Sequence, residues 1–403
     1  RDLVRSRGLG DVYKRQSENR SKLLPQINAI AGYNNNFDPP VSVTDGSSYG
    51  VPYNITKTLQ HSANAGLEMQ MPLFNQTLYT SMSIAKVMEE ISRLSYGKAR
   101  EDVILQISKM YYLGQVTAEQ IMLIKANITR LEELRDITQA FFDNGMSMEV
   151  DLKRVNINLE NLKVQYDNAQ AMMKQQLNML KYIMDYPAEK EIALTPVNTD
   201  SITTVALTGL SENIYELQLS QSQVQLAERQ KKIITNGYIP SLSLTGSWRY
   251  AAYTDKGYHW FHSGPSNQWF RSYGVGLTLR IPIFDGLDKT YKIKKAMIDI
   301  ENKRLAWEDA RKNLQTQYLN AVNDLMNNQR NFKKQKDNYL LAEDVYAVTS
   351  DRYREGIASM TEVLQDEMQM SEAQNNYISA HYNYRVTNLM LLKLTGQIES
   401  LVK

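Results

Sequence analysis

The stretch "RSYGVGLTLRIPIFDG", residues 271–286, has the pattern of a β-strand that stops at a proline. Every second residue from Tyr273 to Ile281 is apolar, and the residues between them are small or polar. Alternation with a period of two places these two sets on opposite faces of a strand. Pro282 has no N–H group to donate to a neighbouring strand. We therefore expect a strand at about residues 271–282 with one apolar and one polar face.

Similar strands are expected at three other places: about residues 26–36, 62–72 and 240–252. Each is about 10 residues long, which is the length that a tilted membrane-spanning strand needs. Alternation alone also fits an ordinary half-buried sheet. Three of the four tryptophans lie near predicted strand ends, as in an interfacial aromatic girdle: Trp248, Trp260 and Trp269. This favours a membrane sheet in which Leu277 and Leu279 face lipid, with Leu279 near mid-barrel.

The chain repeats itself after about 210 residues. The segment "LPQINAIAGY" (24–33) is similar to "IPSLSLTGSW" (239–248), and "GLEMQMPLFN" (66–75) is similar to "GLTLRIPIFD" (276–285). Two further pairs of similar segments follow at nearly the same offset. We expect two repeats, at 17–197 and 198–403, that share one order: strand, loop, strand, long helix, turn and return helix.

Long helices are expected between the strands because residues 73–186 and 283–403 contain no proline. Apolar residues recur there at the spacing of supercoiled helices, as in a heptad stripe: Tyr318, Leu325, Phe332, Tyr339, Tyr346 and Tyr353. The expected helices lie at about 75–142 and 147–184 in the first repeat, and at about 211–236, 287–355 and 361–395 in the second. A lone glycine, Gly356, is expected to form the turn of a helical hairpin.

Residues 1–16 do not fit this plan. The segment "RDLVRSRGLGDVYKRQ" lacks the apolar core of a signal peptide and begins with arginine. The repeat predicts a helix equivalent to 211–236 before Leu24, and too few residues remain there to form it. We interpret 1–16 as a non-native segment and expect the natural N-terminus to be missing.

Composition excludes several classes of function. The formal net charge is +2, and residues 1–16 hold five basic and two acidic side chains, so no basic surface for nucleic acid is expected. No stretch approaches the roughly 20 apolar residues of a membrane-spanning helix. There is no cysteine, and the one histidine pair at ligand-like spacing, His259 and His262, lies in a predicted loop. We expect no catalytic residue, no metal site and no cofactor, and hence no enzyme.

Four strands cannot close a barrel, because the smallest membrane barrels have about eight. Open strand edges in lipid would leave backbone groups unpaired. Other chains must therefore complete the sheet. Two protomers would supply eight strands and three would supply twelve, and the wider barrel leaves an aqueous lumen.

The ordered and duplicated features resemble the outer membrane efflux protein family, the TolC-like channel-tunnels of Gram-negative bacteria. The resemblance covers about residues 20–400 and rests on "QMPLFNQ", "RIPIFDG", "RYREGIASMTEVLQDEMQMSEAQNNY" and "AHYNYRVTNLMLLKLTGQ". It implies an α+β membrane protein that forms a homotrimer, with a 12-stranded barrel in outer membrane lipid and a 12-helix tunnel through the periplasm. It also implies two partners, a periplasmic adaptor protein and an inner-membrane pump, and a role as passive export duct for small molecules such as drugs.

The resemblance assigns roles to individual residues. The adaptor-docking tips are the two hairpin turns: Asn144, Gly145, Met146 and Ser147 in one, and Glu355, Gly356, Ile357, Ala358 and Ser359 in the other. The periplasmic gate contains Asp151, Tyr353 and Glu362, although Asp151 and Glu362 also fit ordinary acids at helix N-termini. Two gate residues of the family are replaced here, an arginine by Ala358 and an aspartate by Gln365, so a gate must use other bonds.

The polar faces of the strands carry three charged residues that we expect in the barrel lumen: Glu68, Arg249 and Arg280. Two other interpretations stay open. The chain could be a coiled-coil scaffold whose strands form an ordinary sheet. Within the channel class, a type I protein-secretion duct would have the same architecture.

Overall fold

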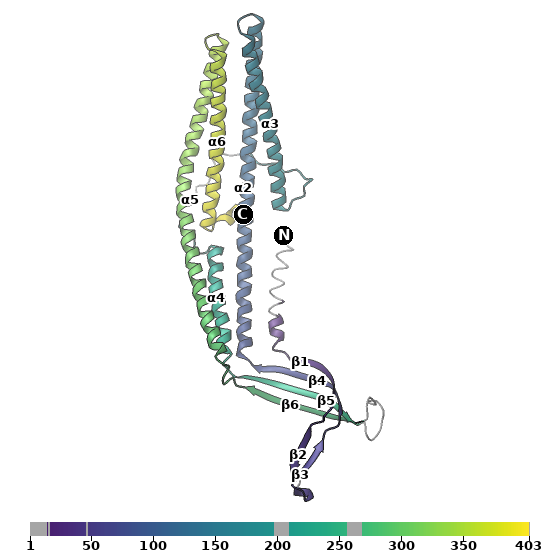
Figure 1. Cartoon of the computed structure of the whole chain (residues 1–403). Coiled ribbons are helices and arrows are strands. Elements are labelled where there is room, and N and C mark those ends of the chain that lie inside the picture. Colours follow the sequence, from purple (N-terminus) through teal and green to yellow (C-terminus); the bar gives the residue numbers. More distant parts are fainter. Residues whose placement is uncertain (1–13, 15–16, 46, 197–208, 256–267, 403) are drawn as a thin grey trace. The chain divides into compact units, whose positions relative to one another are not determined.

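The computed structural model describes residue 14 and residues 17–45, 47–196, 209–255 and 268–402. Trp260, His259, His262 and nearly all of the 1–16 segment lie outside these residues. The described chain is mostly helical, with a four-stranded sheet and a separate two-stranded hairpin (Figure 1). Two short 3-10 helices, Ser47–Tyr49 and Ile398–Val402, and a short helical stretch at residues 17–21 are also present.

Four antiparallel strands form the larger sheet within the described residues: β1 (Gln26–Asn35), β4 (His61–Phe74), β5 (Ser241–Thr254) and β6 (Trp269–Arg280). Their order in the sheet is β1-β4-β5-β6, so β1 and β6 are the edges. Every residue of β6 is exposed. The sheet therefore has two open edges, one on each side of the central pair.

The register of the strands confirms the predicted faces. One row across the sheet runs Ala29, Leu67, Trp248 and Tyr273, which are all apolar or aromatic. The adjacent row runs Asn28, Glu68, Ser247 and Gly274, which are polar or small. Because side chains alternate along each strand, these rows lie on opposite faces of the sheet. The sheet has one mainly apolar face, which also carries Arg271, and one mainly polar face, which also carries Ile30 and Phe270.

Several details of the strands differ from expectation. Strand β6 ends at Arg280, before Pro282, so Leu279 lies at the end of the strand and not near its middle; the mid-strand residue of the apolar face is Val275. Trp248 lies in the middle of β5, because that strand stays paired with β4 as far as Thr254. Trp269 does begin β6, as a girdle residue would.

Two features of the first repeat were also not expected. Strand β4 continues through Pro72 with a register shift before Phe74, which a proline permits at a bulge. A hairpin of β2 (Val41–Asp45) and β3 (Tyr53–Lys57) occupies the connection between β1 and β4. Its five-residue strands were too short to stand out as periodic segments.

The helices lie close to their expected bounds: α2 (Gln76–Asp143), α3 (Glu149–Met184), α4 (Tyr215–Asn236), α5 (Asp288–Arg354) and α6 (Met360–Leu394). The largest differences are at the starts of α3 and α4, which begin a few residues later than expected. Helices α2 and α3 form one hairpin, and α5 and α6 form the other (Figure 1). In the described part of the chain, none of the helices combines the length and the apolar character needed to cross a bilayer.

The heptad stripes form the helical core. Tyr346 and Tyr353 of α5 pack with Leu131 of α2, Val155 of α3 and Val363 of α6 in one buried cluster. A second cluster joins α5 and α6 to the start of α4: Leu314, Tyr318, Ala321, Leu325, Tyr384, Leu391, Leu394, Ile214 and Leu217. Apolar stripes on four helices thus meet side by side, as the spacing predicts.

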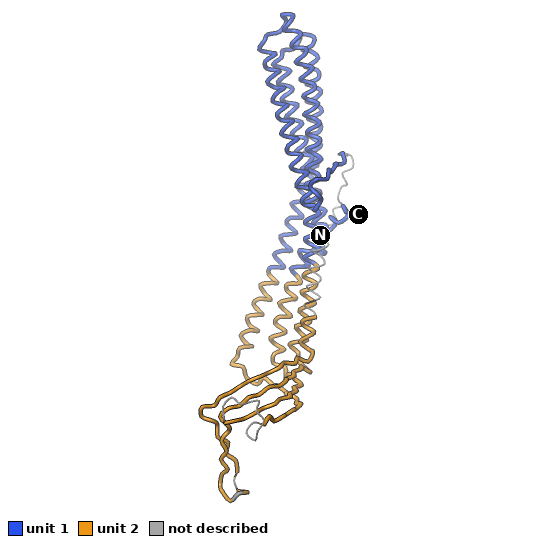
Figure 2. The backbone as a smooth tube through the Cα atoms, turned by 90° about the vertical axis from the view of Figure 1, so that its right-hand side faces the viewer, with its two compact units in different colours: residues 1, 94–220, 306–403 blue, residues 2–93, 221–305 orange. Residues whose placement is uncertain are grey.

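The chain divides into two compact units, shown in different colours in Figure 2. One unit contains 94–220 and 306–403, and the other contains 2–93 and 221–305. Each unit takes segments from both sequence repeats. The spatial division therefore separates helical hairpins from the sheet and its adjoining helix ends, and does not separate one repeat from the other.

Candidate functional site

Both helical hairpins turn at a glycine. Gly145 has φ +71° and Gly356 has φ +74°, and a side chain on either would meet open space. In the second turn the Ile357 N–H donates to the Arg352 carbonyl and the Gly356 N–H donates to the Tyr353 carbonyl, at 2.8 and 2.9 Å. This is a Schellman motif, in which the residue after the helix takes a left-handed conformation that glycine adopts without strain. The predicted turn at Gly356 is confirmed.

The two turns differ in how the next helix begins. At α6, the Glu362 N–H donates to the Ser359 hydroxyl at 3.3 Å and the Ser359 N–H donates to the Glu362 carboxylate at 2.8 Å. These bonds form a capping box and hold the pKa of Glu362 below its usual range. At α3, the cap residue is Met148 and no side chain caps the helix. Glu362 therefore caps helix α6, as expected for an ordinary acid at a helix N-terminus.

The structure brings the two turns together around one hollow. It is lined by Gly145, Met146 and Ser147 of the first turn and by Glu355, Gly356, Ala358 and Ser359 of the second. Asp151 and Tyr353 also line it, whereas Asn144, Ile357 and Glu362 are not among its lining residues. Residues 210 positions apart in the chain thus share one concave surface at the hairpin tips.

An arginine that sequence reasoning missed bridges this hollow. The guanidinium of Arg154 in α3 lies 3.3 Å from the Asp151 carboxylate and donates to the Thr361 hydroxyl of α6 at 3.3 Å. Arg154 also lines the hollow. Its spacing of three residues from Asp151 on one helix face was the available signal.

Tyr353 lines the hollow and also packs into the helical core. Its side chain is buried, its ring packs on Phe141 and its hydroxyl lies 3.4 Å from that of Thr138 in α2. The adjacent Arg354 lies 3.6 Å from Glu133, also in α2. These contacts tie the end of α5 to α2. Asp151, Tyr353 and Glu362 are thus held by three different sets of bonds and do not bond to one another.

A second polar tie links α2 to the other hairpin farther from the turns. The side-chain amides of Asn127 and Gln374 are buried and donate to each other at 2.7 and 3.3 Å. Arg130 donates to Asn127 at 2.9 Å and pairs with Glu343 of α5. Buried polar groups left without partners are costly, so this network fixes the register of α2 against α5 and α6.

A fully buried histidine of α6 forms another polar contact with α2. His381 of α6 is 0% exposed, and Arg385 donates to its Nε2 at 2.9 Å, so its Nδ1–H is free to donate to Glu119 at 3.2 Å. Tyr377 donates to the same carboxylate at 2.8 Å. Burial opposes ionisation of Glu119, but these two hydrogen bonds outweigh it and hold the pKa of Glu119 below its usual range.

Glu367 of α6 is a buried acid of a different kind. It is 4% exposed, and its Oε1 has no hydrogen-bond partner among the described residues. Burial raises the pKa of this carboxyl. Burial likewise raises the pKa of Glu101 in α2, so the helices hold acids whose pKa is shifted in opposite directions.

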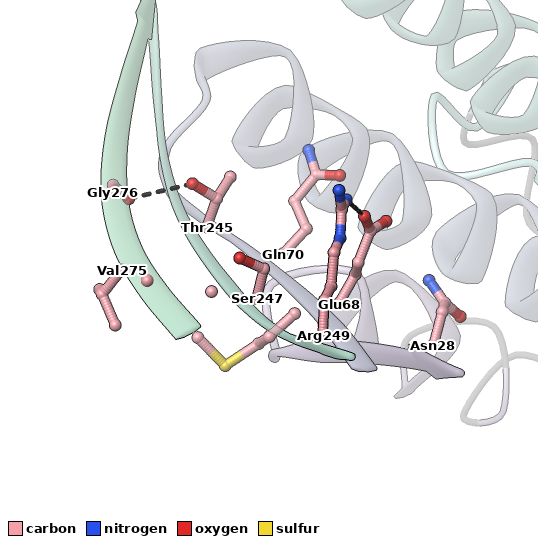
Figure 3. Close-up of a pocket in the computed structure, with 11 residues that line it drawn as sticks. Asn28, Glu68, Gln70, Thr245, Ser247, Arg249, Val275 and Gly276 are labelled. Atoms are coloured by element: carbon pink, nitrogen blue, oxygen red, sulfur yellow. Dashed lines mark hydrogen bonds and ion pairs between the residues drawn. The ribbon is translucent and has the colours of Figure 1, made fainter. Parts of the chain in front are cut away.

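The polar face of the sheet forms a second candidate site (Figure 3). Glu68 of β4 and Arg249 of β5 form an ion pair across this face, and Asn28, Gln70 and Ser247 lie around it. Arg249 lies opposite Gly66 in the register, where an added Cβ would come within 2.9 Å of the Arg249 Cα. The absence of a side chain at Gly66 thus allows the pair to form.

Arg280 does not join this pair. It is the last residue of β6 and lies opposite Ser241, at the end of the sheet where the helices begin. The structure therefore brings together two of the three predicted lumen residues. Among the described residues, no group of histidine and acidic side chains has the arrangement of a metal site.

Comparison with known proteins identifies the class to which these tips and this sheet belong. Residues 15–184 and 206–397 match the profile of a family described as "Outer membrane efflux protein". The chain belongs to the outer membrane efflux protein family. It is 21% identical over 403 residues to outer membrane protein TolC of Vibrio cholerae. The aligned region covers 96% of this chain and 85% of that protein.

Two further proteins show the same relationship. The probable efflux pump outer membrane protein TtgC of Pseudomonas putida is 23% identical over 379 residues, covering 89% of this chain and 75% of that protein. The solved structure of CusC, described with conformational changes accompanying folding and transmembrane channel formation, has a TM-score of 0.78 at 16% identity and covers 98% of this chain and 89% of CusC. The family resemblance expected from the sequence is confirmed.

Family membership decides between the interpretations that the sequence left open. The chain is an outer membrane efflux channel protein of a Gram-negative bacterium. The family and its named members are outer membrane channels and not enzymes. A coiled-coil scaffold with an ordinary sheet is therefore the wrong interpretation.

Proposed function

We propose that three copies of this chain assemble into one export duct, with a 12-stranded barrel in the outer membrane and a helical tunnel in the periplasm. The observation that carries the proposal is the sheet with two open edges, of which β6 is exposed along its whole length. In lipid, an unpaired edge leaves backbone N–H and C=O groups without partners at several kcal/mol each. Pairing β6 of one protomer with β1 of the next removes both edges.

Three copies are favoured over two by the polar face of the sheet. It carries the charged pair Glu68 and Arg249. An eight-stranded barrel fills its interior with side chains, whereas a twelve-stranded one leaves room for water around charged groups.

The hollow between the hairpin turns is the proposed docking site for a periplasmic adaptor, and an inner-membrane pump completes the pathway. Exposed Met146, Met148 and Ile357 give the turns apolar contact surface next to polar backbone. In the gate role proposed for Asp151, Tyr353 and Glu362, the hydrogen bonds and ion pairs between the two hairpins would hold the gate closed. Arg154 to Thr361, Arg354 to Glu133 and Tyr353 to Thr138 are among the bonds that would have to break if the two hairpins separate.

Small molecules are the proposed cargo. The proteins related to this chain include ones named for toluene and antibiotic efflux in Pseudomonas putida. A chain without catalytic or cofactor-binding arrangements among its described residues fits a passive duct, in which the pump supplies the energy. Protein export through the same architecture is the competing outcome.

Two experiments test the proposal. The mass of the purified protein in neutral detergent should correspond to three chains, and a stable folded monomer would contradict the assembly. Expression in a strain that lacks its own channel should restore resistance to small toxic compounds when the matching adaptor and pump are supplied. Restored protein secretion without restored resistance would assign the chain to the secretion class.

A further inference from the structure

The junction between the sheet and the helices carries an unusual concentration of positive charge. Segments 228–236, at the end of α4, and 285–295, at the start of α5, together hold seven basic and three acidic side chains, although the formal charge of the whole chain is only +2. Packing brings the two segments together. The Tyr238 hydroxyl lies 3.3 Å from that of Thr290, and the Lys289 ammonium lies 5.0 Å from the centre of the Tyr238 ring.

Most of this charge is not neutralised within the chain. Asp285 pairs with Lys289 at 2.9 Å and Asp288 pairs with Lys292 at 2.6 Å. Five cations have no acidic partner among the described residues: Arg229, Lys231, Lys232, Lys294 and Lys295. Like charges on neighbouring segments repel one another, so a nearby anionic surface would stabilise this cluster.

Large apolar side chains adjoin these cations. Ile283 and Phe284, between β6 and α5, are 93% and 80% exposed, and Tyr238 and Tyr291 are also exposed. The Lys294 ammonium lies 5.7 Å from the centre of the Tyr291 ring. Apolar residues, tyrosines and lysines side by side are the composition of a membrane–water interface, where rings sit at headgroup level and long cationic side chains reach the phosphates.

We propose that this junction, defined by Arg229, Lys232, Ile283, Phe284, Lys294 and Lys295, binds the anionic phospholipid headgroups of the membrane leaflet next to the helices. The proposal rests on the proposed function, in which the sheet spans the outer membrane. Ile281 and Ile283 follow the end of β6 and are 56% and 93% exposed, so exposed apolar side chains lead from the strand toward the cationic start of α5. At 1.5 Å per residue, Lys294 and Lys295 lie about 10 Å along α5 from its start, within reach of a headgroup layer.

The backbone keeps the cluster close to the strand end. Gly286 and Leu287 both have φ +67°, so the chain turns sharply and α5 begins at Asp288. A left-handed conformation is unfavourable for leucine and persists only where the surroundings enforce it. A longer and relaxed connection would move the lysines away from the membrane surface.

Native mass spectrometry of the assembled protein tests the inference. The probes are phosphatidylglycerol and phosphatidylcholine of equal chain length, added to the protein in neutral detergent. Each basic residue near an anionic surface contributes about fivefold in binding, so the triple variant Lys232→Gln, Lys294→Gln, Lys295→Gln should bind phosphatidylglycerol at least tenfold more weakly. Phosphatidylcholine binding should not change, and added salt should weaken phosphatidylglycerol binding to the unmodified protein.

The matched control removes three lysines from the same helix in the other compact unit: Lys333→Gln, Lys334→Gln and Lys336→Gln. It changes the net charge equally and should keep full phosphatidylglycerol binding. Equal binding by both variants, or no preference for phosphatidylglycerol in the unmodified protein, overturns the inference. Loss of assembly in the Lys232, Lys294, Lys295 variant also overturns the inference, because the cluster would then be a contact between copies. A variant that loses only adaptor binding and keeps phosphatidylglycerol binding overturns it as well.

Failure of the proposed function gives a different result. In that case the unmodified protein would be a monomer in detergent or absent from the outer membrane fraction, before any lipid is added.

Discussion

An arginine on the apolar face of β6 should prevent membrane insertion, whereas one on the adjacent polar position should not. Val275 is 80% exposed, lies in the middle of the strand and shares its face with Tyr273 and Leu277. In a barrel, arginine at the bilayer midplane costs about 2–4 kcal/mol, which reduces the folding equilibrium by roughly 30- to 900-fold for each chain. Val275→Arg should therefore leave most of the protein uninserted.

Gly274→Arg is the matched control, because it adds the same side chain one residue away and at the same depth. Gly274 lies in the polar row opposite Ser247 of β5, its φ is not positive, and an added Cβ would lie 4.0 Å from the Ser247 hydroxyl. The new guanidinium would face the water-filled side of the sheet. We expect little loss of insertion.

Depth supplies a further check. Leu279 shares the apolar face of Val275 but lies at the end of β6, so Leu279→Arg should cost only about 0–1 kcal/mol. The assay is folding into lipid vesicles across a urea series, measured by the mobility of folded and unfolded protein on gels without heating. Equal losses for Val275→Arg and Gly274→Arg, or a Leu279→Arg loss as large as that of Val275→Arg, would refute the assignment of the faces.

Three other outcomes are expected in the helical hairpins. Gly356→Val should preserve insertion but weaken adaptor capture, because a β-branched residue at φ +74° costs roughly 1–2 kcal/mol. Gly356→Asn should retain capture, because asparagine tolerates this conformation. Equal capture by the two variants would show that docking does not depend on the geometry of the turn. Asn127→Leu should lower thermal stability by about 1–3 kcal/mol because Gln374 loses its partner, and adding Gln374→Leu should recover part of the loss; simple additivity of the two losses would argue against the amide pair. Burial raises the folded-state pKa of Glu367 above its ordinary 4.5, so the native protein loses stability as pH rises from 4.5 through this raised pKa. Glu367→Gln should therefore melt at a higher temperature than the unmodified protein at pH 8 but not at pH 4. The same melting-temperature difference at both pH values would contradict this.

The sequence determined the long helices, the four strands of the larger sheet and their faces, but not the hairpin of β2 and β3. Alternation in 271–282 needs no tertiary information, because the two faces of a strand follow from backbone geometry. The end of a strand near a proline does depend on its surroundings, because β6 ends at Arg280 before Pro282 whereas β4 continues through Pro72. The heptad stripe from Tyr318 to Tyr353 similarly fixed which face of α5 is buried. Gly356 was recognisable as a turn because a lone glycine in a long helical run signals a left-handed residue.

The tertiary structure decided which distant side chains meet. Arg154 could pair with Asp151 on helix geometry alone, but its bond to Thr361 exists only because two hairpin tips from separate repeats lie together. The pairing of Asn127 with Gln374, and of Glu119 with His381, likewise depends on the axial register of α2 against α6. A heptad pattern leaves this register open, because sliding one helix by seven residues restores the same apolar seam while changing every polar partner. Local periodicity is a property of the chain, whereas the choice of polar partners belongs to the packed molecule.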